Sequence, residues 1–264
     1  MHRWKWLLCV LLISVLMVSC GSRSDDETPP AAAPEDTSSA ESSPEGDAMD
    51  IETMARYKEY ADLWDSEHEI NGDYIGRIRF DSSIIDLPIV QGETNDTYLR
   101  TDWQTMEYDV YGSIFLDYRN TLDDQNLIIY GHFSYPSMDP ERTIMFTPLD
   151  KLIDKENYEE NSRFSILLRD EIRHYKVVYI YYCPIYTDST GFQYTAEDMQ
   201  YYRTKYTEEY LEQYIKAISD AEFYSTGESI EATDDIVTLQ TCVYDREDLR
   251  LIVIAKETGR ETIR

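Results

Sequence analysis

The sequence predicts a mostly β domain, folded as a barrel or a sandwich, with helices packed on its outside. Short runs rich in Val, Ile and Tyr recur between residues 74 and 186 and again near the C-terminus, and these residue types favour strands. The chain contains 23 tyrosines, which strengthens this signal. Only two segments show the 3.6-residue periodicity of an amphipathic helix. Many strands with few helices are typical of a sheet that closes or stacks on itself.

An export signal is predicted at residues 1–20. Arg3 and Lys5 precede an apolar run over residues 6–18, which has the length of the apolar region of a signal peptide and is shorter than the ~20 residues that span a bilayer. The run ends at Cys20 in a pattern that resembles the lipobox of bacterial lipoproteins, in which this cysteine is lipidated. An uncleaved signal anchor is the alternative. Both alternatives predict a domain held at the extracytoplasmic face of the membrane.

A linker and one folded domain are predicted after the export signal. Residues 21–50 consist mainly of Pro, Ala, Ser and acidic residues, which cannot bury a core, so we expect them to be disordered. A coil of this length reaches roughly 30 Å and would hold the domain away from the membrane. Residues 51–264 are long enough for one compact domain with a sizeable core.

The chain is strongly acidic, with 52 Asp and Glu residues against 24 Lys and Arg residues and a net charge of −28. Such a charge repels phosphate backbones, so we expect no nucleic-acid partner. The simplest interpretation is a soluble surface. The alternative is an electrostatic field that attracts cationic amine substrates.

A helix is predicted at the start of the domain, because apolar side chains fall on one helical face. These side chains are Met54, Tyr57, Ala61 and Trp64. Gly72 follows as a stop signal. Alternating or continuous apolar runs then predict a series of strands. The predicted strands are residues 74–80, 84–90, 112–118, 126–132, 163–169 and 172–186.

A second helix is predicted within residues 196–219, where Thr195 and Asp198 fit a capping box. Its apolar face is predicted to carry Tyr210, Leu211, Tyr214 and Ile218. Two further strands are predicted near the C-terminus, on either side of a loop that separates Cys242 from Arg250.

Three side chains that can carry chemistry lie at the ends of predicted strands: His132, Cys242 and Arg250. A cysteine nucleophile must lose its proton, and a neighbouring imidazole can take it. A guanidinium supplies a fixed charge and several donors for a developing oxyanion. Together these residue types meet the requirements of acyl transfer. Taken singly, each also fits a structural role, as a satisfied histidine, a buried thiol or a solvated charge.

The second cysteine of the domain, Cys183, lies inside an apolar run and is expected to be buried. A disulfide between Cys183 and Cys242 is an open alternative, although it would remove the nucleophile. Two cysteines are too few to indicate a disulfide framework.

The motifs around these side chains resemble those of sortases. TLQTC, which ends at Cys242, and RLIVIAK, which starts at Arg250, are similar to the sortase cysteine motif and arginine strand, and IIYGH is similar to the histidine strand. The run YGSIFLDYRNTLDDQNLIIYGH resembles class B sortases in particular. The resemblance extends over about residues 74–256. It implies an eight-stranded sortase-type β-barrel with an N-terminal helix and a long helical insertion before the last strands.

The resemblance implies a role for each side chain. Cys242 would be the nucleophile, His132 the general acid and base, and Arg250 the donor to the substrate and the oxyanion. Thr241, beside the thiol, would be a further stabilising residue. The residues implied to bind the substrate peptide are Thr241, Gln240, Asn95, Leu99, Tyr181, Tyr182 and Ile185.

The function implied by the resemblance is that of a cysteine transpeptidase. It would cleave the C-terminal sorting signal of a surface protein after a threonine, hold the product as a thioester on Cys242, and pass it to an amine of peptidoglycan or to a pilin lysine. No metal or cofactor is required. Phe133 and Val243 differ from the residues common at these places in class B sortases, which bears on substrate preference. A thiol protease that only hydrolyses and a catalytically silent, surface-tethered binding protein with the same fold are the alternatives.

Overall fold

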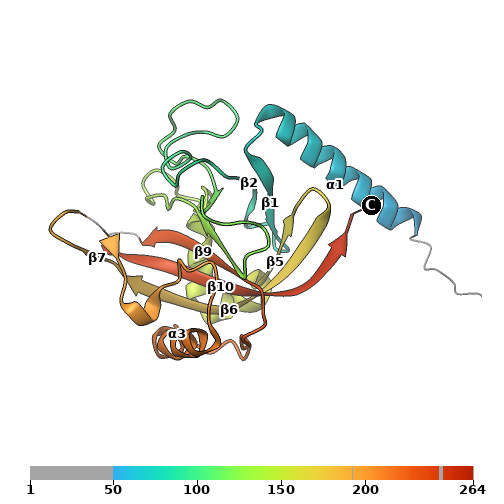
Figure 1. Cartoon of the computed structure of the whole chain (residues 1–264). Helices are drawn as coiled ribbons and strands as arrows, with labels where there is room; N and C mark the ends of the chain where they lie inside the picture. The colour runs from blue at the N-terminus through green and yellow to red at the C-terminus, as the bar shows by residue number, and fades with distance from the viewer. Residues whose placement is uncertain (1–49, 192, 244–245, 264) are drawn as a thin grey trace, which may run out of the picture. The chain divides into compact units, whose positions relative to one another are not determined.

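The structure is a computed structural model and describes residues 50–191, 193–243 and 246–263 (Figure 1). The predicted export signal with Cys20, and most of the predicted linker, lie outside these residues and stay predictions. Within the described ranges, no helix combines the length and the apolar character that crossing a bilayer requires.

Eight of the described strands close into a barrel, which confirms the predicted mostly β fold. They follow one another in the order β1, β2, β3, β4, β9, β10, β6 and β5, and β5 pairs with β1 to complete the circle. Neighbouring strands are antiparallel except for β2 with β3 and β4 with β9, which are parallel. The bounds are β1 Tyr74–Phe80, β2 Asp86–Val90, β3 Phe115–Leu116, β4 Asn126–Tyr130, β5 Arg163–Leu167, β6 Glu171–Pro184, β9 Ile236–Val243 and β10 Arg246–Thr262.

The barrel interior is filled by aliphatic and aromatic side chains of the strands. In β1, burial alternates from residue to residue, as expected for a strand with one face in the core. The central residues of β6, β9 and β10 are instead buried on both faces. Val177, Leu239 and Val253 point into the barrel, whereas Tyr181 and Ile252 belong to a second apolar cluster outside it. Burial on both faces explains why these strands read as continuous apolar runs.

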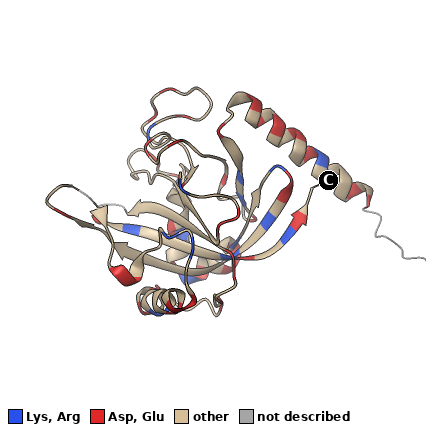
Figure 2. Cartoon of the chain, viewed as in Figure 1, with Lys and Arg blue, Asp and Glu red and all other residues tan. Residues whose placement is uncertain are grey.

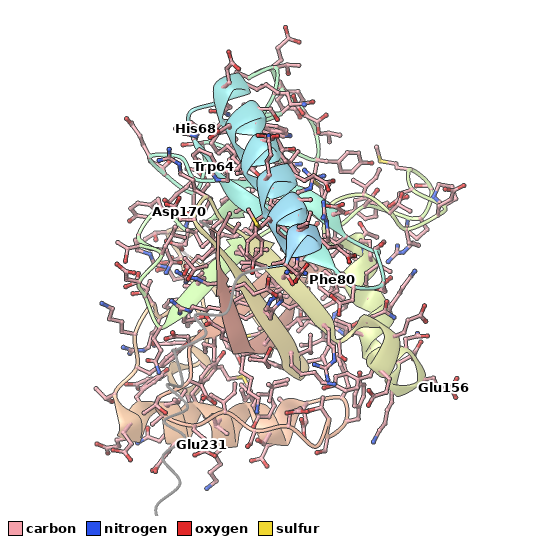
Figure 3. All side chains as sticks on the ribbon, turned by 90° about the vertical axis from the view of Figure 1, so that its right-hand side faces the viewer. Trp64, His68, Phe80, Glu156, Asp170 and Glu231 are labelled. Carbon is pink, nitrogen blue, oxygen red and sulfur yellow. The ribbon has the colours of Figure 1, made fainter. Side chains whose placement is uncertain are left out.

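The helix α1 (Ile51–Ile70) packs beside β1 on the outside of the barrel (Figures 1 and 3). Trp64 donates a hydrogen bond to a backbone carbonyl of β1 and stacks on His68, with ring centroids 4.5 Å apart. Of the predicted apolar face, Tyr57 is buried. The prediction for Met54 is wrong, since this side chain lies in the first turn of the helix and is 57% exposed.

The helix α3 (Glu208–Ala221) packs against β6 and covers the second apolar cluster (Figure 1). It begins after Thr207, whose side chain accepts a hydrogen bond from the backbone N of Tyr210 at 3.2 Å. The capping box predicted at Thr195 is therefore wrong, and a short 3-10 helix, η3 (Glu197–Met199), follows that residue instead. The predicted apolar face is confirmed by the burial of Leu211, Tyr214 and Ile218.

Shorter elements connect the strands. They are η1 Thr147–Ile153, η2 Lys155–Asn157, α2 Tyr158–Asn161, β7 Tyr186–Thr187 and β8 Gln193–Tyr194. β7 and β8 form a two-stranded hairpin of their own directly after β6. Figure 2 shows acidic residues on α1, on the loops and on the insertion around α3, so the negative charge is distributed over several elements.

Candidate active site

The parallel pairing of β4 with β9 places the histidine beside the cysteine. Tyr130 is in register with Gln240, and the backbone N of Gly131 donates to the carbonyl oxygen of Gln240 at 3.1 Å, which extends the ladder beyond β4. Two residues after Tyr130 and Gln240 come His132 and Cys242. Because both residues are two positions beyond a paired residue, their side chains lie at the same level and on the same face of the sheet. Neighbouring strands are ~4.8 Å apart, so the two side chains are close to each other.

Gly131 is required by packing at the end of β4. A Cβ atom at this position would lie 2.5 Å from Cδ1 of Ile114 and 2.6 Å from Cγ of Phe146, well inside van der Waals contact. Both neighbours are buried core residues that have little room to move. The glycine therefore lets the chain pass close to the core and present His132 at the rim of the barrel.

The antiparallel pairing of β9 with β10 places the arginine on the other side of the cysteine. Arg250 is in register with Cys242. His132, Cys242 and Arg250 therefore form one row across three neighbouring strands, with the thiol in the middle. Cys242 is exposed, and the other two side chains are half-buried. We call this arrangement the catalytic row.

The ring of His132 is held by the backbone of a neighbouring loop, with Nε2 at 2.7 Å from the carbonyl oxygen of Leu99. A carbonyl oxygen only accepts, so Nε2 carries a proton, and in the neutral ring Nδ1 is the basic nitrogen. Burial of the ring lowers the pKa of His132 below its usual range, and the charge of Arg100 acts in the same direction. The bond to Leu99 and the charge of Asp109 oppose this shift without reversing it. The imidazole is therefore neutral at neutral pH and able to accept a proton.

The guanidinium of Arg250 is aligned by three acceptors. Nη1 donates to the carbonyl oxygens of Leu249 and Glu247, at 2.9 and 3.0 Å. Nη2 donates to Oε1 of Gln193 on β8 at 3.2 Å. These bonds fix the plane of a fork that has further N–H groups to offer to an oxyanion.

The second thiol, Cys183, lies on the far side of Arg250 from Cys242. It is in register with Arg250 on β6, so two strand spacings, roughly 10 Å, separate the two cysteines. A disulfide needs Cα atoms within ~7 Å. Both thiols are free, so the alternative of a disulfide is excluded. Burial raises the pKa of Cys183 to about 12, which leaves Cys242 as the candidate nucleophile.

Two hollows meet at Cys242. The imidazole pocket, of about 220 Å³, also contains His132, and its wall is completed by Arg100, Val110, Tyr111, Tyr135 and Met138. The barrel-mouth pocket, of about 380 Å³, has a wall that includes Arg142, Asp150, Ile153, Tyr182, Arg246 and Leu251. Phe133 and Val243 line both pockets. The thiol can thus be approached from two sides.

Two residues predicted to bind substrate border the catalytic row. Leu99 is 37% exposed, and its carbonyl oxygen holds His132. Gln240 is half-buried on the same face as Cys242, and its Oε1 accepts a hydrogen bond from the hydroxyl of Tyr201 at 2.7 Å. Leu99 and Gln240 therefore lie beside His132 and Cys242, and their binding role stays a prediction.

Two more of these residues lie at the end of β6. Tyr182 lines the barrel-mouth pocket and packs edge-on against Phe223, with ring centroids 4.8 Å apart. Ile185 is half-buried, and its backbone N donates to the carbonyl oxygen of Asp248 at 2.7 Å. Tyr182 has surface on a hollow that reaches Cys242, whereas Ile185 joins the end of β6 to the first residues of β10, just before Arg250.

Two residues predicted to bind substrate do not reach a groove. Tyr181 is completely buried under α3, where its hydroxyl lies 3.0 Å from that of Tyr214. Thr241 is 1% exposed, and its hydroxyl has no hydrogen-bond partner among the described residues. Neighbouring residues of a strand point to opposite faces, so Thr241 turns away from the face of Cys242. Tyr181 and Thr241 therefore line neither hollow at Cys242, and their binding role stays a prediction.

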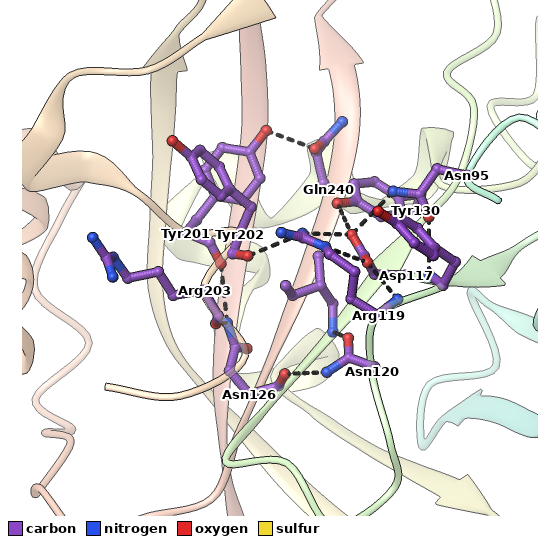
Figure 4. A network of polar contacts seen from close by, with 12 residues as sticks. Asn95, Asp117, Arg119, Asn120, Asn126, Tyr130, Tyr201, Tyr202, Arg203 and Gln240 are labelled. Carbon is purple, nitrogen blue, oxygen red and sulfur yellow. Dashed lines mark hydrogen bonds and ion pairs between the residues drawn. The ribbon is translucent and has the colours of Figure 1, made fainter. Parts of the chain in front are cut away.

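Asn95 belongs to a buried polar network (Figure 4). Its Nδ2 donates to Oδ2 of Asp117 at 3.0 Å, and its Oδ1 accepts from the backbone N of Tyr118 at 3.0 Å. The fully buried Asp117 also accepts from the hydroxyl of Tyr130 and from Nε of Arg119, each at 2.8 Å. Burial acts to raise the pKa of Asp117, but these donors, Arg119 foremost, hold it below the usual range. The network engages the amide of Asn95 that was predicted to bind substrate.

The network ties together three segments around the catalytic row. The loop that contains Asn95 also supplies the carbonyl that holds His132. Nη2 of Arg119 donates to the carbonyl oxygen of Tyr202 at 3.1 Å, in the insertion before α3. Sequence reasoning missed Asp117, whose only signal is one acidic residue inside an apolar run. The partners of Asp117 come from separate segments, which a strand pattern does not reveal.

The catalytic row can perform acyl transfer through its side chains alone. A thiol can act as a nucleophile, an imidazole of lowered pKa can accept a proton, and a guanidinium on the neighbouring strand can donate to a developing charge. Within the described ranges, no three His, Cys, Asp or Glu side chains gather in a way that could hold a metal ion.

The chain is similar to proteins of one family over most of the described residues. The sortase domain family matches residues 78–258. Sortase B of Listeria monocytogenes is 30% identical over 193 residues, which are 71% of this chain and 71% of the relative. Sortase B of Staphylococcus aureus is 26% identical over 209 residues, which are 77% of this chain and 78% of the relative.

Solved structures of the same kind share the fold. A cysteine-to-serine mutant of Clostridium perfringens sortase B has a TM-score of 0.65 and 26% identity, over 79% of this chain and 92% of that one. The substrate complex of Staphylococcus aureus sortase B has a TM-score of 0.63 and 24% identity, over 78% of this chain and 89% of that one. These similarities agree with the eight-stranded barrel described above.

Proposed function

Because the chain belongs to the sortase family, as a class B sortase and hence a cysteine transpeptidase of cell-wall sorting, we propose that Cys242, His132 and Arg250 carry its reaction. The observation that supports this assignment is the register of β4, β9 and β10, which brings the three side chains into one row. The proposed acyl donor is the C-terminal sorting signal of a surface protein, cleaved after a threonine.

The first half of the proposed reaction forms a thioester. Nδ1 of His132 takes the thiol proton, and the sulfur of Cys242 attacks the carbonyl carbon of the scissile peptide bond. Arg250 donates hydrogen bonds to the carbonyl oxygen as it gains charge. His132 then returns the proton to the nitrogen of the leaving chain. The carbon–nitrogen bond breaks, and the acyl group stays on sulfur.

The second half transfers the acyl group to an amine. The nitrogen of a peptidoglycan amine or of a pilin lysine attacks the thioester carbon, and His132 accepts the proton that this nitrogen loses. A new amide bond forms, the carbon–sulfur bond breaks, and the proton returns to Cys242. Water can replace the amine as a slower nucleophile, which yields a carboxylic acid.

A peptide groove is proposed next to the catalytic row. The substrate complex of Staphylococcus aureus sortase B supports a peptide ligand for this fold. In this chain, Leu99, Gln240 and Tyr182 are the predicted binding residues that have surface beside Cys242 or on a hollow that reaches it. They are the first positions at which to test the sequence preference of the sorting signal.

The decisive experiment compares Cys242→Ala with Cys183→Ala in the full-length protein. Peptides of the sorting-signal type, with threonine at the cleavage position, are incubated with and without amine acceptors, and the products are identified by mass. We expect cleavage and amide formation with the wild type and with Cys183→Ala, and neither with Cys242→Ala at unchanged thermal stability. Normal cleavage by Cys242→Ala would contradict the proposal.

The same experiment separates the alternatives. A thiol protease would give only the hydrolysed peptide at every amine concentration. A silent binding protein would give no cleavage, and its Cys242 would not react with a thioester-forming peptide. Amide products that increase with amine concentration are expected only from a transpeptidase.

Sortases act at the cell surface, and we propose that residues 1–20 hold this one at the membrane, with Cys20 as the lipidation site and residues 21–50 as the linker. The mass of the protein extracted from membranes tests this proposal. A chain that starts at Cys20 and carries acyl groups supports a lipoprotein, and a chain of full length supports an uncleaved anchor. A shorter, unmodified chain in the culture medium would contradict both.

A further inference from the structure

The wall of the imidazole pocket has a charge opposite to that of the protein. The chain as a whole carries a net charge of −28. Among the described residues that line this pocket, however, no Asp or Glu is present, and Arg100 is the only Lys or Arg. The described wall of a hollow that contains both Cys242 and His132 therefore carries a single positive charge within a strongly negative molecule.

The charge of Arg100 is directed to the pocket and is not neutralised by a direct ion pair within the described ranges. Nη1 of Arg100 donates to the carbonyl oxygen of Val110, a neutral acceptor in the same wall. Asp109, whose charge also acts on His132, uses Oδ1 to accept from the backbone N of Tyr111 at 2.6 Å. Arg100 also acts on the imidazole, whose pKa its charge lowers.

The imidazole pocket is the side from which the amine must arrive. In the proposed reaction, the leaving nitrogen and the attacking nitrogen both exchange a proton with His132, so both occupy the same place at different times. Arg250 lies on the opposite side of the thiol, which is where the proposed oxyanion would form. The acceptor amine is therefore expected in the pocket that contains His132, with its neighbouring groups close to Arg100.

We infer that the imidazole pocket binds the acceptor and that Arg100 selects an amine whose own carbon carries a carboxylate. This inference rests on the proposed transpeptidation. A guanidinium fork matches a carboxylate in two parallel hydrogen bonds, whereas it repels a cationic amine that has no such group. The acidic surface attracts amines of every kind by its long-range field, and Arg100 discriminates among them at short range.

The size of the effect follows from the exposure of Arg100. Its side chain is exposed, so an ion pair there is partly screened by water. We therefore expect a preference of about three- to tenfold in kcat/KM, since exposed ion pairs are weak and bidentate charged hydrogen bonds are stronger. A preference of this size selects among acceptors without making the reaction dependent on Arg100.

The test uses three acceptors that differ at one carbon. In Nα-acetyl-diaminopimelate, the carbon that carries the free amine also carries a carboxylate. In the monoamide, a neutral carboxamide replaces this carboxylate. In Nα-acetyl-lysine, a hydrogen atom replaces it. Amide products of the full-length protein are measured by mass under competition between acceptors. We expect the carboxylate acceptor to give more amide product than either of the other two acceptors. The amine of the monoamide is less basic and more often unprotonated at neutral pH, so intrinsic reactivity would favour the opposite order.

Variants of Arg100 assign the preference to this side chain. Arg100→Ala should abolish it, Arg100→Lys should retain part of it, and Arg100→Glu should reverse it in favour of lysine. Arg246→Ala, which removes a cation from the barrel-mouth pocket instead, should leave it intact. The change of the His132 pKa in these variants affects all acceptors alike and cancels in the ratio of products.

Two outcomes would overturn the inference: equal use of the three acceptors by the wild type, or a carboxylate preference that survives in Arg100→Ala. In both cases the proposed function would still stand if amide products form. Hydrolysis of the peptide without any amide product would instead contradict the transpeptidase mechanism itself. The failure of the inference and the failure of the function are thus distinguishable.

Discussion

His132 is more constrained than Cys242, its neighbour in the catalytic row. One ring nitrogen is bonded to the carbonyl of Leu99, and the ring is half-buried, whereas the thiol of Cys242 is exposed. The backbone bond fixes both the orientation of the ring and the nitrogen that remains basic. The pKa of His132, set by burial and by Arg100, therefore decides in which pH range the row can accept and return a proton.

Removal of a positive charge should shift this range. We expect Arg100→Ala to raise the pKa of His132, because the lost charge disfavours the protonated ring. The limb of the pH profile for peptide hydrolysis that belongs to His132 should move to higher pH, and NMR titration of the ring should follow it. Arg246→Ala serves as the control with the same charge change. An unchanged or lowered pKa in Arg100→Ala would refute this account of the histidine.

Replacement of the arginine fork by a point charge should slow the chemical step. We expect Arg250→Lys to lower kcat about 100-fold, the loss typical of one oxyanion donor, because an ammonium cannot keep the three bonds that align the guanidinium. Steady-state kinetics with one cleaved peptide measures this loss. Arg246→Lys is the matched control and should retain most of the activity. A loss confined to KM would assign Arg250 to binding alone.

At the level of elements, the loop before β3 depends on the Asp117 network. Asp117→Ala removes a fully buried acceptor from Asn95, Tyr130 and Arg119 and leaves the half-buried donors of Asn95 and Tyr130 without this partner. We expect it to lower the free energy of unfolding by about 3 kcal/mol. Denaturant unfolding measures the loss, and Asp96→Ala, an exposed carboxylate of the same loop, should cost little.

Activity should fall further than stability in the same variant. The loop held by Asp117 carries the carbonyl of Leu99, so its loosening also frees the ring of His132. Hydrolysis measured under conditions where Asp117→Ala is fully folded should still be slower than in Asp96→Ala. Equal activities of Asp117→Ala and Asp96→Ala under those conditions would show that the network only stabilises the fold.

The comparison of sequence and structure differs from element to element. The runs that became β1, β4, β9 and β10 were predictable, since apolar strands of this length have few alternatives. The predicted strand 112–118 is reduced to β3, because Gly112 adopts a positive φ of 54° and the chain still turns there. In β6, both faces are buried, so periodicity could not show that Tyr181 lies under α3.

The site residues at the ends of strands could be predicted from the sequence, whereas the residues positioned by loops could not. Cys242, His132 and Arg250 each follow or begin an apolar run, and the register of three strands then places them side by side. Thr195 fits a capping box in sequence, but the helix begins after Thr207, whose side chain accepts from the backbone N of Tyr210. Arg100 and Asp117 act through partners distant in the chain, for which no local pattern exists.

For the whole molecule, the net charge of −28 should make the use of cationic acceptors dependent on salt. Added salt screens the attraction between the acidic surface and an ammonium group. We expect kcat/KM for a lysine-type acceptor to fall about threefold between roughly 20 and 300 mM NaCl. Hydroxylamine, which is neutral at pH 7.5, provides the control nucleophile and should show no such fall. A parallel decline for both nucleophiles would point to an effect of salt on the protein itself.

The parallel pairing of β4 with β9 also decides when the enzyme becomes active. Tyr130 and Gln240, which are paired, are separated by 110 positions in the chain, and parallel strands cannot form as a local hairpin. Contacts of such long sequence separation form late in folding. A chain that has not finished folding therefore has Cys242 without His132 beside it, and in the proposed reaction the capacity to acylate that thiol appears only when folding is complete.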